Sequence, residues 1–485
     1  MRHGETLRRR LTAVVLLAGL AACRPPAPLV SPAGGVPSSE RPVPALVADL
    51  EERTFHYFWD LAHPETGLVP DRWPTPSFSS VAAVGFGLTA YGIGAERGWV
   101  SREAARERTL GTLRFLAAAP RGPEPAGTIG HRGFFYHFLH MDSGHRFERV
   151  ELSSIDTALL IAGVLFSQSY FDRDDPGERE IRSLAEELYR AVEWPWMVVR
   201  PPAVAMGWTP EAGFHGWDWR GYNEAMILLI LALGSPTHPI APEAWDAWTR
   251  DYVWGEFHGQ EHISFPPLFG HQYTAVWVDF RGIQDDYTRA KGLDYHENSR
   301  RAAYSHRAYA IANPEGWRGY GAELWGLSAS DGPFDGTLEI DGRTRTFHTY
   351  WARGVGLVEH CDDGTIVPTA AASSVAFAPE IAIPAIAAQK AYGGDRLYGR
   401  YGFFDAFNPT LRVPVKLQHG RIDPELGWFD TDYLGIDQGP IVALIENYRS
   451  DLVWRTMKRN PHLVRGLRRA GFRGGWLETV SEAAR

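Results

Sequence analysis

The strongest constraint on the fold is an alternation between two kinds of helical segment. Segments of the first kind are apolar on almost every face, as in residues 155–166, which predicts helices that are buried all round. Segments of the second kind carry charged residues along one face, as in residues 101–118, and predict helices with one face in water. A chain with both kinds must place one set of helices inside the other.

The alternation recurs along the body of the chain. Buried helices are expected to begin near Ser80, Ser153, Tyr222, His271, Ser373 and Asp437. Amphipathic helices are expected at 45–62, 101–118, 177–192, 242–254, 285–311 and 452–469. Repeats of a buried helix with an exposed partner indicate stacked helical hairpins. We therefore predict an all-α fold, an (α/α)₆ barrel of six inner and six outer helices, and not an open solenoid, which would need a fixed short period.

One segment has strand periodicity instead. Residues 337–347 alternate around Asp341-Gly342, a dipeptide typical of β-hairpin turns. We interpret this segment as a small β-hairpin inserted near the mouth of the barrel.

The N-terminus has the pattern of an export signal. Arginines precede an apolar run at 11–22, which is too short to cross a bilayer as a mature helix. Leu20-Ala21-Ala22-Cys23 resembles a bacterial lipobox, with Cys23 as the lipidated first residue; a plain signal peptide is the alternative. We predict a lipoprotein signal peptide at 1–22, a lipidated, Pro-rich tether at 23–44 and one catalytic domain at 45–485. Arg24 after the cysteine resembles lipoproteins of the outer membrane, which implies a periplasmic or cell-surface location and membrane contact through Cys23 alone.

Composition excludes some classes of function. The net charge of −9, with acids spread throughout, argues against a nucleic-acid partner. Cys361 is the one other cysteine, so no disulfide framework is expected. Nothing in the sequence indicates a protein partner.

Acidic residues gather near the expected starts of inner helices: Asp142, Glu151, Asp156, Glu224 and Asp437. Hydrolysis of a glycosidic bond needs two carboxyl groups, one protonated and one ionised, and neighbouring inner helices can supply them. The alternative is that these acids cap helices and favour the helix dipole. Capping explains Glu151 and Glu224 less well, because Glu151 precedes the cap position and Asn223 is the better cap. Glu151 and Glu224 are therefore the leading pair, with the acid and the base unassigned.

Aromatic residues cluster around these acids. The chain has 18 Trp, and the segment Gly216-Trp217-Asp218-Trp219-Arg220 reads as a polar loop. Flat aromatic surfaces beside polar groups suit the C–H faces of sugars. The alternative is that a large barrel needs bulky core residues, but Trp is rarely fully buried.

A competing motif is His258-Gly259-Gln260-Glu261-His262, which matches the H-x-x-E-H pattern of zinc peptidases. That pattern requires a helix, on which the two histidines share a face. Gly259 within the motif and Pro266-Pro267 after it argue against a helix, so we predict no metal site here.

The chain resembles glycoside hydrolase family 144, the "putative glucoamylase" domain family, whose characterised members are endo-β-1,2-glucanases. The resemblance extends from about residue 54 to residue 476 and rests on long segments in order: FHYFWDLAHPETGL, AAVGFGLTAYGIGAERGW, FFYHFLHMDSG, ELSSIDTALLIAG, GYNEAMILLILALGSPTHP, FPPLFGHQYTAVWVDFRGIQD, NSRRAAYSHRAYAIANPEGWRGYG, DDGTIVPTAAASSVAFAPEIAIPA and WFDTDYLGIDQGPIVALIENYRS.

The resemblance implies an (α/α)₆ barrel that hydrolyses β-1,2-linked glucan with inversion, without metal or organic cofactor. The family's acids correspond to Glu151, Asp156, Glu224 and Asp142, although His140 stands where an acid is expected. Candidate substrate-binding residues are Phe135, His140, Trp217, Trp219, Tyr222, Asn223, Arg281, Asp437 and Gln438. The family also includes exo-acting members that release a disaccharide, so exo-hydrolysis releasing sophorose remains an alternative, as does a non-catalytic glycan-binding lipoprotein.

Overall fold

The structure is a computed structural model that describes residues 40–358 and 360–480 of the chain. The predicted signal peptide, Cys23 and most of the predicted tether lie outside the described residues. The end of the tether segment contacts the barrel, since Glu40 forms an ion pair with Arg97 (2.8 Å) and the backbone N–H of Arg41 donates to the carbonyl of Arg449 (2.8 Å). The packed body therefore includes residues 40–44, ahead of the expected boundary at 45.

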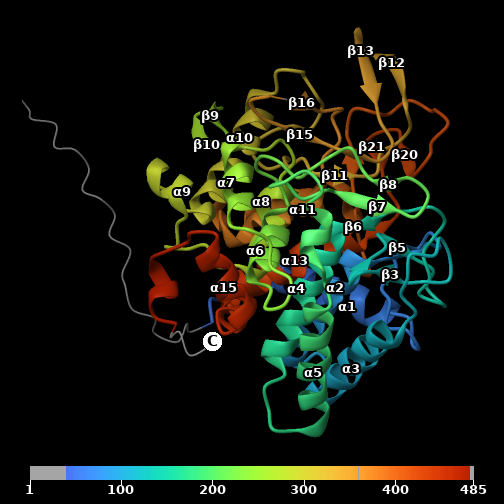
Figure 1. Cartoon of the computed structure of the whole chain (residues 1–485). Coiled ribbons are helices and arrows are strands. Elements are labelled where there is room, and N and C mark those ends of the chain that lie inside the picture. The colour runs from blue at the N-terminus through green and yellow to red at the C-terminus, as the bar shows by residue number, and fades with distance from the viewer. Residues whose placement is uncertain (1–39, 359, 481–485) are drawn as a thin grey trace, which may run out of the picture. The chain divides into compact units, whose positions relative to one another are not determined.

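An inner ring of helices forms the centre of the fold (Figure 1). Its members are α2 (Val81–Arg97), α4 (Ser154–Tyr170), α6 (Met226–Gly234), α8 (Phe269–Trp277), α11 (Pro368–Ala372) with the 3₁₀ turn η2 (Ser373–Ala376), and α13 (Gly435–Ser450). Helix α2 contacts α4, α4 contacts α6, α6 contacts α8, and α13 contacts both α11 and α2. The side-chain amide of Gln272 on α8 donates to the carbonyl of Ala370 on α11 (2.9 Å), which closes the ring.

Outer helices cover this ring: α1 (Ala45–Leu61), α3 (Arg102–Ala118), α5 (Pro176–Arg190), α7 (Glu243–Arg250), α10 (Tyr295–Ala312) and α12 (Pro379–Gly393). Outer and inner helices pack in pairs, such as α3 with α2, α5 with α4 and α10 with α8. The chain thus folds as an (α/α)₆ barrel, which confirms the predicted class. None of the helices in the described part of the chain has the length and apolarity to cross a membrane.

Several helix boundaries differ from the sequence-based expectation. The segment expected at 285–311 is split by Gly292, in the left-handed conformation (φ 70°), into α9 (Asp286–Lys291) and α10. The segment at 452–469 is split before Pro461 into α14 (Leu452–Met457) and α15 (Pro461–Arg469). Helix α12 was not predicted, because Pro384 lies inside it and proline normally marks a helix end.

Short strands occupy the loops that connect the helices, and sequence analysis found few of them. The two-stranded pairs are β1 (Arg72–Trp73) with β22 (Tyr433–Leu434), β2 (Ser79–Ser80) with β5 (Phe138–Leu139), β3 (Gly130–His131) with β4 (Phe134–Phe135), β9 (Val253–Phe257) with β10 (Gln260–Ser264), β11 (Ala329–Ser330) with β14 (Trp351–Ala352), β15 (Gly354–Val355) with β16 (His360–Cys361), and β17 (Tyr398–Gly399) with β18 (Gly402–Phe403). Two sheets have three strands: β6 (Leu152–Ser153), β7 (Gly207–Thr209) and β8 (Gly213–Phe214), and β19 (Phe407–Asn408), β21 (Gly427–Phe429) and β20 (Arg421–Asp423).

The predicted hairpin is present as β12 (Gly336–Ile340) and β13 (Arg343–Phe347), which projects at the top of Figure 1. Asp341 and Gly342 both have positive φ (55° and 71°), as the two central residues of a type I′ turn require.

The N-terminal ends of inner helices meet at one end of the barrel. Strands β2 and β6 directly precede α2 and α4, and β22 precedes α13; these strands pair with segments of the same end of the fold. Serine caps begin two of the helices: Ser80 accepts from the N–H of Ala83, and Ser153 accepts from the N–H of Asp156. The expected start of a buried helix near Ser153 is thus confirmed.

The opposite end of the barrel is closed. Helix α14 contacts α2, α4, α8 and α13. Its Trp454 is buried, and the indole N–H donates to the carbonyl of Ala275, near the C-terminal end of α8 (2.7 Å). The barrel is therefore open at the N-terminal ends of its inner helices only.

Helices α2 and α4 approach each other backbone to backbone. A Cβ placed on Gly163 would lie 2.0 Å from the carbonyl oxygen of Gly85, and one on Gly85 would lie 2.3 Å from the carbonyl oxygen of Leu159. Both positions need glycine because the contact is with main-chain atoms, which cannot move aside.

We expect Gly163→Ala to lower the free energy of unfolding by about 1–3 kcal/mol, since the methyl group forces α2 and α4 apart. Gly111→Ala on α3 is the matched control, because nothing lies within 4 Å of a Cβ there. That control should gain about 0.5–1 kcal/mol from helix propensity. Urea denaturation measures both; equal effects of the two substitutions would contradict this account of the packing.

Candidate active site

Three of the predicted acids lie at the starts of two adjacent inner helices. Glu151 directly precedes β6, Asp156 is in the first turn of α4, and Glu224 lies two residues before α6. The Asn223 side chain accepts from the N–H of Ala225 (3.0 Å), so Asn223 and not Glu224 supports the start of α6. Because α4 contacts α6, the three carboxyl groups share one end of the barrel.

His137 joins two of these acids. Its Nδ1 lies 2.9 Å from Oε1 of Glu151, and its Nε2 lies 3.5 Å from Oδ2 of Asp156. Burial alone would lower the pKa of His137, but the charges of Asp156 and Glu151 outweigh it and raise the pKa to about 9. His137 is therefore an imidazolium held between two carboxylates at neutral pH.

The pKa values of Glu151 and Glu224 move in opposite directions. Burial tends to raise the pKa of Glu151, but the hydrogen bond and charge of His137 overcome this and hold it below its usual value. Burial raises the pKa of Glu224 to about 7, and the charge of Asp156 adds to the increase. Oε2 of Glu224 is buried and has no hydrogen-bond partner in the structure. Glu151 is thus ionised at neutral pH, whereas Glu224 keeps its proton up to about pH 7.

A second group of acids lies at the start of α13. Asp437 is buried in the first turn but does not cap the helix. Burial raises its pKa to about 7. Burial and the adjacent carboxyl group of Asp437 raise the pKa of Asp405 well above its usual range, and the charge of Asp331 adds to the increase.

Tyr273 on α8 connects the two groups of acids. Burial raises its pKa well above the usual value, and the charges of Asp437, Glu224 and Asp156 add to the increase. The carboxyl groups at the starts of α4, α6 and α13 therefore all act on the pKa of this one buried tyrosine.

A cavity of about 880 Å³ opens at this end of the fold. Its lining comes from several loops: Arg72, Pro76, Ser77, Phe78, His140, Met141, Asp142, Phe147, Asp331, Asp335, Thr349, Tyr350, Gln418 and His419. Of the predicted residues, His140 and Asp142 are in this lining. The Asp142 side chain is 95% exposed and lies 3.3 Å from His63, so it belongs to the rim and not to the buried acid group.

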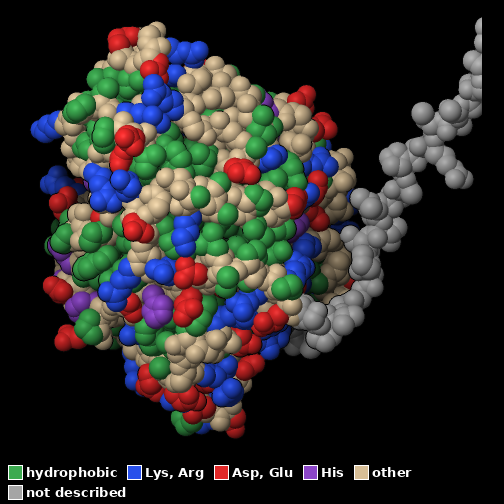
Figure 2. All heavy atoms as spheres, turned by 180° about the vertical axis from the view of Figure 1, so that it is seen from behind, with side chains coloured by type: hydrophobic (Ala, Val, Ile, Leu, Met, Phe, Trp, Pro, Cys, Tyr) green, Lys and Arg blue, Asp and Glu red, His purple; other side chains and the backbone are tan. Residues whose placement is uncertain are grey.

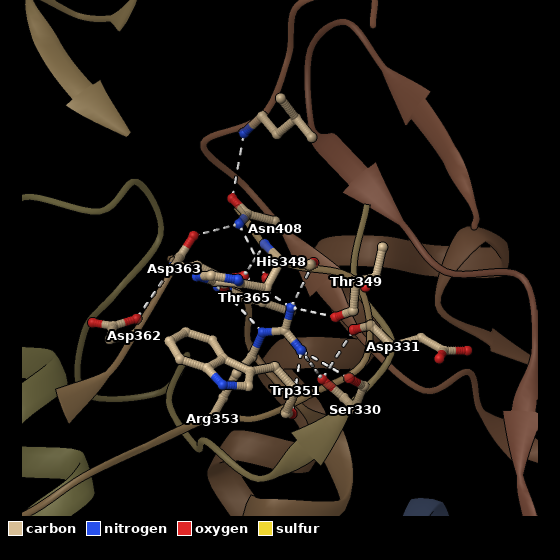
Figure 3. Close-up of polar contacts among 12 residues, drawn as sticks. Ser330, Asp331, His348, Thr349, Trp351, Arg353, Asp362, Asp363, Thr365 and Asn408 are labelled. Carbon is tan, nitrogen blue, oxygen red and sulfur yellow. Dashed lines mark hydrogen bonds and ion pairs between the residues drawn. The ribbon is translucent and has the colours of Figure 1, made fainter. Parts of the chain in front are cut away.

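A buried ion pair fixes one wall of the cavity (Figure 3). Arg353 is fully buried and makes two parallel hydrogen bonds to Asp363, both 2.8 Å. Its guanidinium also donates to the carbonyls of Ser330 (2.8 Å), His348 (3.0 Å) and Thr349 (3.1 Å). These bonds hold the backbone next to Asp331 and Tyr350, two residues that line the cavity.

The structure contradicts three predicted substrate contacts. Phe135 is buried in the main core, with the guanidinium of Arg121 5.2 Å from its ring centroid. Tyr222 is enclosed in an aromatic cluster with the rings of Trp248, Tyr252, His271 and Tyr295. Gln438 is buried, and its amide donates to the carbonyl of Phe403 (3.0 Å). Apolar and amide side chains beside a site are hard to separate from core by sequence alone.

Arg281 is also corrected, because it lies at the closed end of the barrel. It pairs with Asp279 (2.8 Å) and with Asp451, the C-terminal cap of α13 (3.0 Å). Asp437 is 14 residues earlier on the same helix, so the two ends are roughly 20 Å apart. Trp219 is half-buried, and its indole N–H donates to Ser154 (2.9 Å), whereas Trp217 is 74% exposed and free to contact a ligand.

The H-x-x-E-H motif lies on a β-hairpin. His258 and Gly259 form the turn with positive φ (48° and 78°), and His262 is on β10. The two histidines therefore do not have the helical placement that the zinc peptidase pattern requires.

Sequence analysis missed His137, Arg72, Asp331, Asp405 and Asp430. They lie in loops or, for Arg72, in a two-residue strand, where no helical or strand periodicity separates a functional acid or base from an ordinary surface residue. His137 is within FFYHFLHMDSG and 14 residues before Glu151, so proximity in sequence could have indicated it.

The distribution of charge on the surface agrees with the negative net charge of −9. On the face shown in Figure 2, basic and acidic side chains are interspersed and form no extended basic area.

Comparison with known proteins supports a family assignment. Residues 216–461 match the family described as "putative glucoamylase". A solved putative glucoamylase from Bacteroides uniformis is 32% identical with a TM-score of 0.74, and the match covers 90% of this chain and 100% of that one. An endo-β-1,2-glucanase from Chitinophaga pinensis is 29% identical with a TM-score of 0.74, covering 89% and 99%.

An exo-β-1,2-glucooligosaccharide sophorohydrolase (non-reducing end) from Parabacteroides distasonis is 28% identical over 458 residues. That match covers 87% of this chain but 57% of the relative, so the chain spans little more than half the length of this curated relative.

Fold and site together define a helical barrel with a carboxylate-lined opening. The chain belongs to the putative glucoamylase family, which confirms the resemblance to glycoside hydrolase family 144.

We expect His137→Gln to destabilise the protein in a pH-dependent manner. The folded-state pKa of about 9 exceeds the ordinary 6.5, so the stabilisation by His137 is fully present below pH 6.5 and is lost as the pH rises through 9. The loss in unfolding free energy should be about 1–3 kcal/mol larger at pH 6 than at pH 9.5. Denaturant titrations at both pH values measure this, and a pH-independent loss in His137→Gln would refute it.

Proposed function

We propose that this protein hydrolyses β-1,2-linked glucan with inversion, using Glu224 as the general acid and Glu151 as the general base. The observation that carries the proposal is the opposite shift of the two pKa values at the starts of adjacent inner helices. Pairs of carboxyl groups whose surroundings separate their pKa values are the usual arrangement in glycoside hydrolases.

Glu224 is suited to the acid role because burial keeps it protonated near neutral pH. Its Oε2 is buried and accepts no hydrogen bond in the structure, so this oxygen can carry the proton. Glu151 is suited to the base role because His137 keeps it ionised. Its side chain is 27% exposed, so a water molecule can reach it.

The reaction exchanges one bond for another. Glu224 gives its proton to the glycosidic oxygen as the C–O bond to the anomeric carbon breaks. A water molecule attacks that carbon from the opposite face, and Glu151 takes the proton that the water releases. The product has inverted configuration at the anomeric carbon. Solvent then returns the two carboxyl groups to their starting states.

The substrate class follows from the relatives together with the site. The relatives named above act on β-1,2-glucans or their oligosaccharides. The cavity of about 880 Å³ combines carboxylates with aromatic residues, as glycan sites do. Endo action and exo release of sophorose predict different early products from a long linear glucan: mixed lengths for the first and disaccharide alone for the second.

We expect Glu224→Gln and Glu151→Gln each to reduce kcat on linear β-1,2-glucan by at least about 100-fold, since each removes one proton-transfer step. Wild-type rates should also fall as the pH rises through about 7, where Glu224 loses its proton. Reducing-sugar release, with circular dichroism to confirm folding, measures these effects.

Asp437→Asn is the informative comparison. Activity retained in Glu151→Gln but lost in Asp437→Asn would transfer the base role to Asp437. Saturable glucan binding without product in the wild type would leave only a glycan-binding protein.

We also propose that the chain is exported and anchored to the outer membrane through Cys23. Support comes from the sequence, in which an apolar run ends in Leu-Ala-Ala-Cys. We expect labelled palmitate to be incorporated into the wild type and not into Cys23→Ala. Labelling that persists in Cys23→Ala would contradict this proposal.

A further inference from the structure

Three buried aspartates meet beside the cavity. Asp331 follows β11, Asp405 lies between β18 and β19, and Asp430 follows β21. All three are at most 2% exposed. One side-chain oxygen of each lies within 4.8 Å of those of the other two.

Each of these carboxyl groups is fixed through one oxygen only. Oδ2 of Asp331 accepts from Arg72 (2.5 Å), and Oδ2 of Asp405 accepts from the backbone N–H of Asp331 (2.6 Å). Oδ1 of Asp430 accepts from the backbone N–H of Thr431 (2.6 Å). Rotation of the three side chains is therefore restrained by protein donors.

The second oxygen of each group has no donor. Oδ1 of Asp331, Oδ1 of Asp405 and Oδ2 of Asp430 are buried and without a hydrogen-bond partner in the structure, as is Oδ2 of the adjacent Asp437. Buried polar atoms are nearly always satisfied, and burial of unpaired carboxylates is costly. Within the described residues, the ion pair from Arg72 is the one cationic contact recorded for the three aspartates. The unpartnered atoms thus need a cation or protons.

We propose that Asp331, Asp405 and Asp430 form a binding site for a divalent cation, and that the cation is Ca²⁺. Three carboxylate oxygens are hard ligands, and Ca²⁺ accepts irregular oxygen cages more readily than Mg²⁺ does. Asp331 also lines the cavity, which supplies a path for the ion and for coordinating waters.

A neighbouring set, Asp331 with His419 and Asp432, has comparable spacing. It is the weaker candidate, because Asp331 is the only member of this set with an unpartnered buried oxygen. Oδ1 of Asp432 already accepts from the N–H of Thr75 (3.0 Å). The all-oxygen site with three unpartnered atoms is therefore preferred.

The cation has a structural role separate from the proposed acid and base. It would neutralise carboxyl groups contributed by three loops and hold them together under the cavity. Binding does not depend on the hydrolytic proposal, so the two can fail independently.

The test uses the full chain after treatment with EDTA and removal of the chelator. We expect calorimetric titration with CaCl₂ to show one saturable site and Ca²⁺ to raise the Tm. Asp430→Asn should weaken Ca²⁺ binding at least tenfold. Asp335→Asn, at a partly exposed carboxylate that lines the same cavity, should bind as the wild type does.

Wild-type measurements decide the matter even if Asp430→Asn does not fold. No saturable binding of Ca²⁺ and no change of Tm with EDTA would overturn the proposal and leave shared protons as the means of neutralisation. Tighter binding of Mg²⁺ than of Ca²⁺ would overturn the choice of ion. Equal weakening in Asp335→Asn would show that the cavity attracts cations through its general negative charge, which also overturns the site.

Discussion

Burial of carboxyl groups at the N-terminal ends of the inner helices is the condition on which this molecule's chemistry depends. A ring of helices that are apolar on every face leaves their first turns as the place where polar groups can gather. Poor solvation there penalises negative charge, so each carboxyl group takes its protonation state from its immediate neighbours. Glu151 has an imidazolium beside it and stays ionised, whereas Glu224 has no such partner and keeps its proton.

Ion pairs hold the loops at the open end in place, whereas apolar packing holds the helices of the barrel together. Arg353 and Asp363 form a fully buried pair that also gathers main-chain carbonyls from two segments. Arg72, 259 residues before Asp331 in the chain, reaches the same region through its guanidinium. Arginine suits this function, because its five donors can bridge several loops at once. The cavity wall is consequently a fixed surface and not a set of independent loops.

Sequence periodicity was sufficient for the architecture and for part of the site. Segments that are apolar on every face located α2 and α4, and acids near the expected helix starts indicated Glu151, Asp156 and Glu224. Helix α12 was missed, because proline within a helix cannot be told from a helix end without tertiary contacts. Asp405 and Asp331 were missed, because they are 74 residues apart in loops and only the folded chain brings them together. Arg281 was wrongly predicted to contact substrate. Resemblance to a family segment does not show at which end of the barrel a residue of that segment lies.

Helix α14 has a further effect through its position beneath α2, α4, α8 and α13. A tunnel open at both ends would let a polymer thread along the axis and be processed from one terminus. Helix α14 closes one end of this barrel, so a polymer must enter and leave through the open end. A long polymer can then either lie across the open end or insert one terminus into it. The loops around the open end determine which of these two modes is possible.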